Sequence, residues 1–253
     1  MAEKYNASFK DGSGKPIDGG RGICPIFAVE ENDKIIFLGT GFFITTNGLL
    51  ITAKHCLQKN NGEGYKSVHI IQFLENNKWI RRNMYKPYFN SSDIAVVVPR
   101  MYTDTATGLP IKNIVPTITT RIPAIGEKIA SFAYPKTIVN QDYDLKTINV
   151  ITDTTWHFGE IEDFHPSGIS FLNNPCYQSS MHILGGSSGG PVANTDGKVF
   201  AINSIGADVA DGLEPYSFLT PIANCLDIEI EIDTGEKYSI QKLIDLNQIL
   251  FEK

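Results

Sequence analysis

A run of seven residues from Gly185 to Pro191 constrains the fold of this chain more than any other stretch. It places two serines among four glycines and ends in proline, whose φ is fixed and which has no backbone donor. Such a backbone turns tightly and leaves N–H groups free, and free N–H groups around one small cavity can hold an oxyanion. A serine exposed on this turn is half of a nucleophilic site, which also needs a base and a group that orients the base.

The alternative is that this run is a flexible connector, which its Gly/Ser composition alone supports equally well. However, apolar segments flank the run, with residues 181–184 before it and Val192 and residues 199–202 after it. A linker between domains more often has polar flanks. We therefore interpret the run as a turn between two ordered segments.

The composition is that of a globular protein. With 253 residues, 42% of them hydrophobic, the chain can form one large domain or two small ones around a real core. The net charge of -6 and the lack of a polybasic run argue against nucleic-acid or membrane partners. No segment is apolar for long enough to span a bilayer, and residues 1–10 lack the core of a secretory signal. We therefore expect a cytoplasmic protein, or a secreted one if a signal was trimmed.

The cysteines lie far apart in the sequence and show neither the spacing of a zinc site nor that of a redox dithiol. In a chain of this size without a signal, we predict free thiols. We also predict no metal and no cofactor. The cysteines are Cys24, Cys56, Cys176 and Cys225.

Short β-rich segments separated by turn residues fill most of the chain. Residues 26–29 and 34–38 flank a polar turn and predict one hairpin, and the pair Asn47-Gly48 predicts a second. Further runs of this kind lie at residues 68–73, 94–98, 129–134, 148–151, 169–172 and 199–205. The pattern favours an all-β barrel or sandwich over alternating strands and helices.

The chain divides into two β-rich halves, residues 23–105 and 118–230, joined by a linker at 106–117 that is rich in turn residues. Residues 1–22 have few apolar side chains and no periodicity, and we predict a mobile or loosely docked arm. Apolar residues at helical spacing between Ile240 and Leu250 predict an amphipathic helix within residues 231–253.

Two residues at strand ends could supply the base and its partner. His55 follows an apolar strand, and Asp93 directly precedes residues 94–98, where a buried charge needs a partner. Taken alone, such a histidine is usually structural and such an aspartate can simply cap a turn. Asp104 competes poorly because no apolar strand follows it. The remaining histidines lack a matching context, and we treat them as structural or surface residues: His69, His157, His165 and His182.

Residues 52–56, 93–96 and 186–191, in the order His, Asp, Ser, together resemble the motifs of the trypsin-like (chymotrypsin-fold) serine peptidases. The likeness covers most of residues 23–251 and is closest to short bacterial members without a PDZ domain. It implies an all-β fold of two six-stranded Greek-key β-barrels with a C-terminal α-helix. It also implies hydrolysis of polypeptide substrates through an acyl-enzyme.

The resemblance gives each motif residue a role. His55 is the general base, Asp93 holds the imidazole tautomer, and Ser188 attacks. The N–H groups of Gly186 and Ser188 form the oxyanion hole. Ser188 rather than Ser187 is the nucleophile because it directly precedes Gly-Gly-Pro.

Substrate specificity is implied by the same resemblance. His182 and Ile183 would form the base and wall of the primary pocket, and the strand that pairs with substrate comprises Ser204, Ile205 and Gly206. No aspartate stands at the pocket base, and Asn203 stands where glutamate-specific relatives keep a histidine. We therefore predict an uncharged, small or apolar P1 residue.

Two other functions are compatible with these motifs. The first is a protease-like binding module that does not turn over, although all three catalytic side chains are retained. The second is a latent protease that is activated by a regulatory protein partner or by displacement of the N-terminal arm, since catalytic geometry without substrate can be loose.

Overall fold

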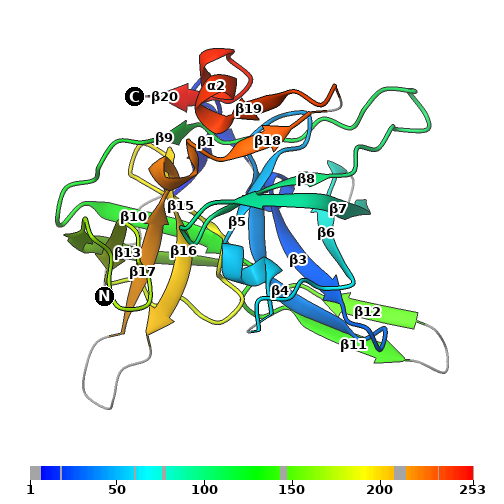
Figure 1. Cartoon of the computed structure of the whole chain (residues 1–253), viewed down its shortest axis with the longest axis horizontal. Helices are drawn as coiled ribbons and strands as arrows, with labels where there is room; N and C mark the ends of the chain where they lie inside the picture. The colour runs from blue at the N-terminus through cyan, green and yellow to red at the C-terminus, as the bar shows by residue number, and fades with distance from the viewer. Residues whose placement is uncertain are drawn as a thin grey trace.

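The structure is a computed structural model that describes residues 7–17, 19–59, 61–75, 78–142, 147–207, 215–232 and 234–252. Six strands from the first half of the chain close into a barrel (Figure 1). They are β3 (Ile23–Val29), β4 (Ile35–Phe43), β5 (Leu50–Thr52), β6 (Ser67–Phe73), β7 (Trp79–Phe89) and β8 (Ala95–Pro99), in the order β3-β4-β5-β8-β7-β6. The turn between β4 and β5 contains Gly48, whose φ of +128° favours glycine.

A second group of six strands forms another closed barrel. Its strands are β10 (Lys128–Ala133), β13 (Thr155–His165), β14 (Cys176–Ser179), β15 (Pro191–Ala193), β16 (Val199–Ala207) and β17 (Tyr216–Pro221). The order is β15-β10-β13-β14-β17-β16, and β16 pairs back onto β15. The short strands β9 (Ile118–Thr119) and β20 (Phe251–Glu252) extend this sheet beyond β16. The predicted all-β fold of two six-stranded barrels is confirmed.

The two barrels share a hydrophobic core. On β4, Phe43 packs inside the first barrel, whereas its neighbour Phe42 belongs to a cluster that also contains Phe132 and Ile202 of the second barrel. Successive side chains of a strand point to opposite faces, so β4 can contribute to both clusters. This shared core fixes the barrels against each other and therefore fixes the loops that meet at their junction.

In the N-terminal arm, residues 7–17 and 19–22 form short elements that pack against the second barrel. It forms β1 (Phe9–Lys10), β2 (Pro16–Ile17) and the one-turn helix α1 (Gly19–Gly22). Phe9 is fully buried and stacks on Trp156 with ring centroids 5.1 Å apart. The amide of Lys10 also donates to the carbonyl of Gly197 (3.0 Å). Burial of a Phe side chain contributes about 1.5–3 kcal/mol, which offsets part of the entropy lost by ordering this segment.

The C-terminal segment is only partly helical. The helix α2 spans Ile240–Asp245, and two strands precede it, β18 (Glu229–Glu231) and β19 (Lys237–Ser239). Ser239 caps its start by accepting from the amide of Lys242, and Asn247, with a φ of 55°, lies just beyond its end. The observed helix is shorter than the predicted span of residues 231–253. Two strands occupy the start of that span, and β20, which pairs with β9, occupies its end.

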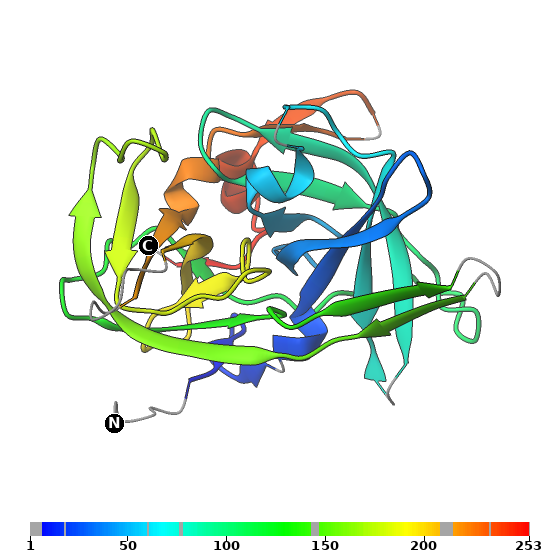
Figure 2. The same ribbon diagram turned by 90° about the horizontal axis from the view of Figure 1, so that it is seen from below.

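Two further features complete the fold. The hairpin of β11 (Ile138–Asp142) and β12 (Thr147–Ile151) extends from the second barrel along β4 of the first (Figure 2). The four cysteines are buried and unpaired. In the part of the chain that the structure describes, no helix combines the length and apolar character needed to cross a membrane.

Candidate active site

His55 and Asp93 form a close pair on the first barrel. His55 lies in the short 3₁₀ helix η1 (Lys54–Leu57) that follows β5, and Asp93 lies in the loop before β8. The Nδ1 atom of His55 is 2.9 Å from Oδ2 of Asp93 and 3.0 Å from Oδ1. The backbone N–H of His55 also donates to Oδ1 (3.1 Å). The carboxylate therefore fixes the orientation of the ring and leaves Nε2 as the ring atom available to another group.

The position of Asp93 is fixed by the loop before it, which lies in the first barrel and is hydrogen-bonded to the second. The side chain of Asn90 accepts from the amide and hydroxyl of Ser92. Its Nδ2 donates to the carbonyl of Asn224 (2.8 Å) and to Oδ1 of Asp227 (2.7 Å). An Asx turn on one barrel that bonds to the other holds the carboxylate close to their junction.

The electrostatics of this pair favour a charged imidazole. Burial lowers the pKa of His55, but hydrogen bonds to the side chains of Asp93 and Cys56, together with electrostatic interactions with both residues, raise that pKa to about 10. Asp93 has 13% of its side chain exposed and His55 has 47%, so the carboxylate acts on the ring from the protein side. The pair can accept and retain a proton at Nε2.

The glycine-rich run of residues 185–191, here called the nucleophile turn, packs tightly against the first barrel. Gly189 has a φ of +82°, and a Cβ at this position would lie 2.2 Å from the carbonyl oxygen of Thr40 and 2.2 Å from the hydroxyl of Thr52. The amide of Thr40 donates to the carbonyl of Ser188 (2.8 Å). The thiol of Cys56, the residue after His55, lies 3.7 Å from the same carbonyl. The turn from the second barrel is thus placed next to His55 of the first.

The free amides predicted from the glycine-rich run are present. The N–H of Ser187 donates to the carbonyl of Leu184 (3.0 Å). In contrast, the N–H groups of Gly186 and Ser188 have no acceptor among the described residues. Gly186 has a φ of +89°, which opens the turn at this point. The two amides are therefore available to bind an oxyanion.

The hydroxyl of Ser188 does not contact His55 in this structure. It donates instead to the carbonyl of Ser204 on β16 (3.3 Å). Within the described residues no hydrogen bond joins Ser188 to the imidazole. The sequence predicts both side chains at one site, and the structure places their segments together without forming this bond.

Two small cavities lie at the site, one at Ser188 and one at His55 and Asp93. One of about 270 Å³ adjoins Ser188 and is lined by Ile183, Leu184, Gly185, Ser188 and Gly206. The other, of about 210 Å³, lies beside His55 and Asp93 and is also lined by residues 171–174 of the second barrel. One cavity therefore adjoins the proposed nucleophile, and the other adjoins the imidazole–carboxylate pair.

The predicted pocket residues are only partly brought together. Ile183 and Gly206 line the cavity at Ser188. Ser204 contributes its carbonyl to the Ser188 hydroxyl, and Ile205 packs beside a cluster that contains Phe218. His182 is exposed and is not among the residues that line this cavity.

The contacts that three further residues make with the serine turn were not indicated by the sequence. Thr40 holds the carbonyls of both Ser188 and Gly186, the latter through its hydroxyl at 3.0 Å. His157, which we predicted as structural or surface, is buried against Ser187. Asn203 donates to the carbonyl of Ser187. Their sequence context held no signal, because each contact joins segments that are distant along the chain.

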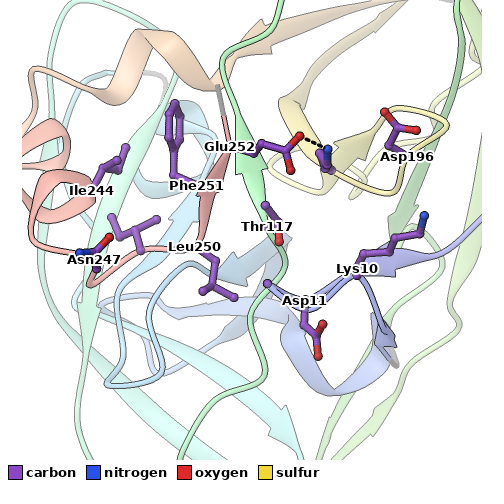
Figure 3. A pocket seen from close by; sticks show the side chains of 13 residues that line it. Lys10, Asp11, Thr117, Asp196, Ile244, Asn247, Leu250, Phe251 and Glu252 are labelled. Atoms are coloured by element: carbon purple, nitrogen blue, oxygen red, sulfur yellow. Dashed lines mark hydrogen bonds and ion pairs between the residues drawn. The ribbon is translucent and has the colours of Figure 1, made fainter.

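A larger cavity, of about 730 Å³, lies at the junction of the N-terminal hairpin and the C-terminal segment (Figure 3). Thr117 stands at its centre, and an ion pair joins Lys198 to Glu252 at one side. None of the predicted catalytic residues lines this cavity. In the described part of the chain, no group of three or more His, Cys, Asp or Glu side chains is placed to hold a metal.

The double barrel, with an imidazole–carboxylate pair facing a glycine-rich serine turn, defines the class of chymotrypsin-fold hydrolases. The sequence pattern of the family described as trypsin-like peptidase domain matches residues 39–202, which is more than half of the chain. The chain belongs to this family, and it is a trypsin-like serine peptidase.

Solved structures of low sequence identity share the fold. The crystal structure of Deg5 has a TM-score of 0.56 at 16% identity. The match covers 81% of this chain and 85% of the Deg5 chain. The HtrA-type protease AlgW with a decapeptide has a TM-score of 0.55 at 14% identity, covering 91% of this chain and 67% of its own. A search of curated proteins finds no match.

Proposed function

We propose that this protein is an endopeptidase that cleaves peptide bonds through His55, Asp93 and Ser188 and a covalent acyl-enzyme. The observation that carries the proposal is the His55–Asp93 pair beside a serine turn in which the amides of Gly186 and Ser188 have no acceptor among the described residues. A neutral hydroxyl is a weak nucleophile, and a positioned base contributes about 10²–10⁴-fold to the rate. The alternative of a non-catalytic binding module would need none of these features.

In the first step, Ser188 leaves the carbonyl of Ser204 by rotation about χ1 and turns toward Nε2 of His55. Such loose geometry is common in the absence of substrate. Nε2 takes the proton as Oγ attacks the scissile carbonyl. The N–H groups of Gly186 and Ser188 bind the oxyanion that forms, and each such donor is worth about 10²–10³-fold in kcat.

In the later steps, the imidazolium of His55 gives its proton to the leaving amine as the tetrahedral intermediate collapses. Asp93 stabilises the imidazolium and keeps Nδ1 protonated throughout. Water then attacks the acyl-enzyme, with His55 again acting as the base. The resting bond to Ser204 reforms after product release.

Labelling with a fluorophosphonate probe tests this proposal. We expect the full-length protein to react, and peptide mapping to place the phosphonyl group on Ser188. A label on Ser187 would reassign the nucleophile. A protein that takes no label at any pH between 6 and 10, while remaining folded, would contradict the enzymatic mechanism and favour the binding module.

We also propose that the cavity at Ser188 receives the P1 side chain. Of the described residues that line it, none is charged, and Ile183 and Leu184 supply apolar surface. An unpaired charge transferred there would be poorly solvated. In a peptide library we therefore expect small or apolar P1 residues to be cleaved at least about 10-fold faster than Lys, Arg or Glu. Preferential cleavage after a charged residue would contradict this assignment.

A further inference from the structure

Ser187, the residue before the proposed nucleophile, is fully buried and bonded to a histidine. Its hydroxyl lies 3.2 Å from Nε2 of His157 on β13. The Nδ1 atom of the same ring lies 2.9 Å from the backbone carbonyl of His182. Because a carbonyl can only accept, Nδ1 carries the ring proton, and Nε2 accepts from the hydroxyl of Ser187.

The surroundings of His157 keep its ring neutral. Burial lowers the pKa of His157, and the nearby imidazole of His182 lowers it further, against the opposing effect of the bond to the His182 carbonyl. A neutral ring has one donor and one acceptor, and both are used here. The ring therefore connects the nucleophile turn to residue 182, next to the wall of the cavity that we assign to P1.

The carbonyl of Ser187 is held as firmly as its hydroxyl. The Nδ2 atom of Asn203 donates to it (3.2 Å) and also to the hydroxyl of Ser131 (2.7 Å), and the amide of Gly190 donates to it as well (3.0 Å). The opposite amide orientation would place Oδ1 of Asn203 against the carbonyl oxygen, so these contacts set the orientation. Asn203 is fully buried.

The direction of the Ser188 amide follows from these contacts. In a planar trans peptide, the C=O of one residue and the N–H of the next point in opposite directions. Fixing the carbonyl of Ser187 toward Asn203 and Gly190 therefore points the N–H of Ser188 away from the barrel interior. That N–H has no other acceptor among the described residues.

We propose that His157 and Asn203 are positioning residues that hold Ser187, so that the amide of Ser188 is aimed at the developing oxyanion. This inference rests on the proposed function, in which Ser188 is the nucleophile. Neither residue lines the cavity that we assign to P1, and both contact Ser187. The contribution is made in the transition state, where the amide binds negative charge, and not in substrate binding.

A double-mutant cycle on the full-length protein tests this inference. We expect His157→Phe and Ser187→Ala each to lower kcat by about 10- to 100-fold, less than the roughly 10²–10³-fold that loss of a whole oxyanion donor costs. KM should stay within about two-fold, because only transition-state binding changes. The double variant should be no slower than His157→Phe alone, since both substitutions break the same hydrogen bond, the one between the Ser187 hydroxyl and Nε2 of His157. His157→Gln, which can still accept from Ser187, should recover part of the loss.

His69 offers a matched control on the first barrel. It is also buried, with Nε2 2.9 Å from the hydroxyl of Ser67 and Nδ1 2.9 Å from Oδ1 of Asn83. His69→Phe therefore removes a histidine of the same kind away from the nucleophile turn. We expect it to lower the melting temperature about as His157→Phe does, while kcat stays within about two-fold of the unaltered protein.

Several results would overturn the inference. Unchanged kcat in Ser187→Ala would do so even if His157→Phe failed to fold. Equal losses of kcat in His157→Phe and His69→Phe would indicate a purely structural role, and multiplied losses in the double variant would indicate that the two side chains act independently. Fluorophosphonate labelling that persists in Ser188→Ala would instead contradict the proposed function.

Discussion

Replacing Ser188 by alanine is expected to lower kcat/KM by about 10⁵–10⁶-fold, because the proposed mechanism has no other nucleophile at this position. The remaining rate would come from the oxyanion hole and substrate binding alone. The substitution removes one hydroxyl whose only bond in the described chain is to the carbonyl of Ser204. The free energy of unfolding should therefore change by no more than about 1–1.5 kcal/mol. Peptide hydrolysis, fluorophosphonate labelling and thermal unfolding measure these effects.

Ser187→Ala is the matched control for this prediction, since it removes the neighbouring hydroxyl and leaves the nucleophile in place. We expect this variant still to be labelled to completion, only more slowly. If Ser188→Ala kept more than about a hundredth of the activity, Ser188 would not be the nucleophile. If both variants lost all labelling while folded, the two hydroxyls could not be assigned separate roles.

Replacing Asp93 by asparagine is expected to lower kcat by about 10⁴-fold. The carboxylate accepts from both Nδ1 and the backbone N–H of His55. The amide nitrogen of an asparagine would face Nδ1 as a donor and favour the tautomer in which Nε2 is protonated, and that tautomer cannot accept the proton of Ser188. Asp104→Asn is a suitable control, because Asp104 is an exposed acid whose carboxylate, among the described residues, accepts only from the amides of Ala106 and Thr107 in its own turn.

Replacing Asp93 by asparagine should also shift the pH dependence of kcat/KM. General-base catalysis needs neutral His55, whose pKa is raised to about 10. The neutral fraction therefore grows as the pH rises, and kcat/KM of the unaltered protein should increase from pH 6 to pH 9. Removal of the Asp93 carboxylate lowers this pKa, so the acid limb of the profile should move to lower pH in Asp93→Asn. An acid limb that stays in place would show that the carboxylate does not control the ring.

Local sequence signals predicted two tight turns, the glycine-rich run and the turn at Asn47-Gly48. The glycines at 186 and 189 adopt positive φ, and the turn at Asn47-Gly48 joins β4 to β5 as the sequence indicates. Such signals depend on backbone angles and side-chain volume at single positions, which neighbouring residues express directly. The roles of His55, Asp93 and Ser188 remain predictions that rest on motif order and on the contacts described here.

Where the predictions were incomplete, long-range pairing decided the outcome. The apolar spacing near the C-terminus predicts a longer helix, but Phe251 pairs with Ile118 as a strand. The polar composition of the arm predicts a mobile or loosely docked segment, and in the structure Phe9 of this arm is buried against Trp156. In both segments the energy comes from partners that are distant in sequence, and local propensity is a weak prior against it.

The sequence by itself determined the barrel-forming β segments, the glycine-rich serine turn and the placing of His55 and Asp93 at strand ends, because each is written in contiguous residues. Only the tertiary structure decided what surrounds them. The register of β13 with β10 sets His157 opposite Ser131, and β10 in turn sets Ser131 opposite Val192, just after the nucleophile turn. That register depends on the packing of whole strands, so no local pattern could indicate that His157 and Asn203 would meet Ser187.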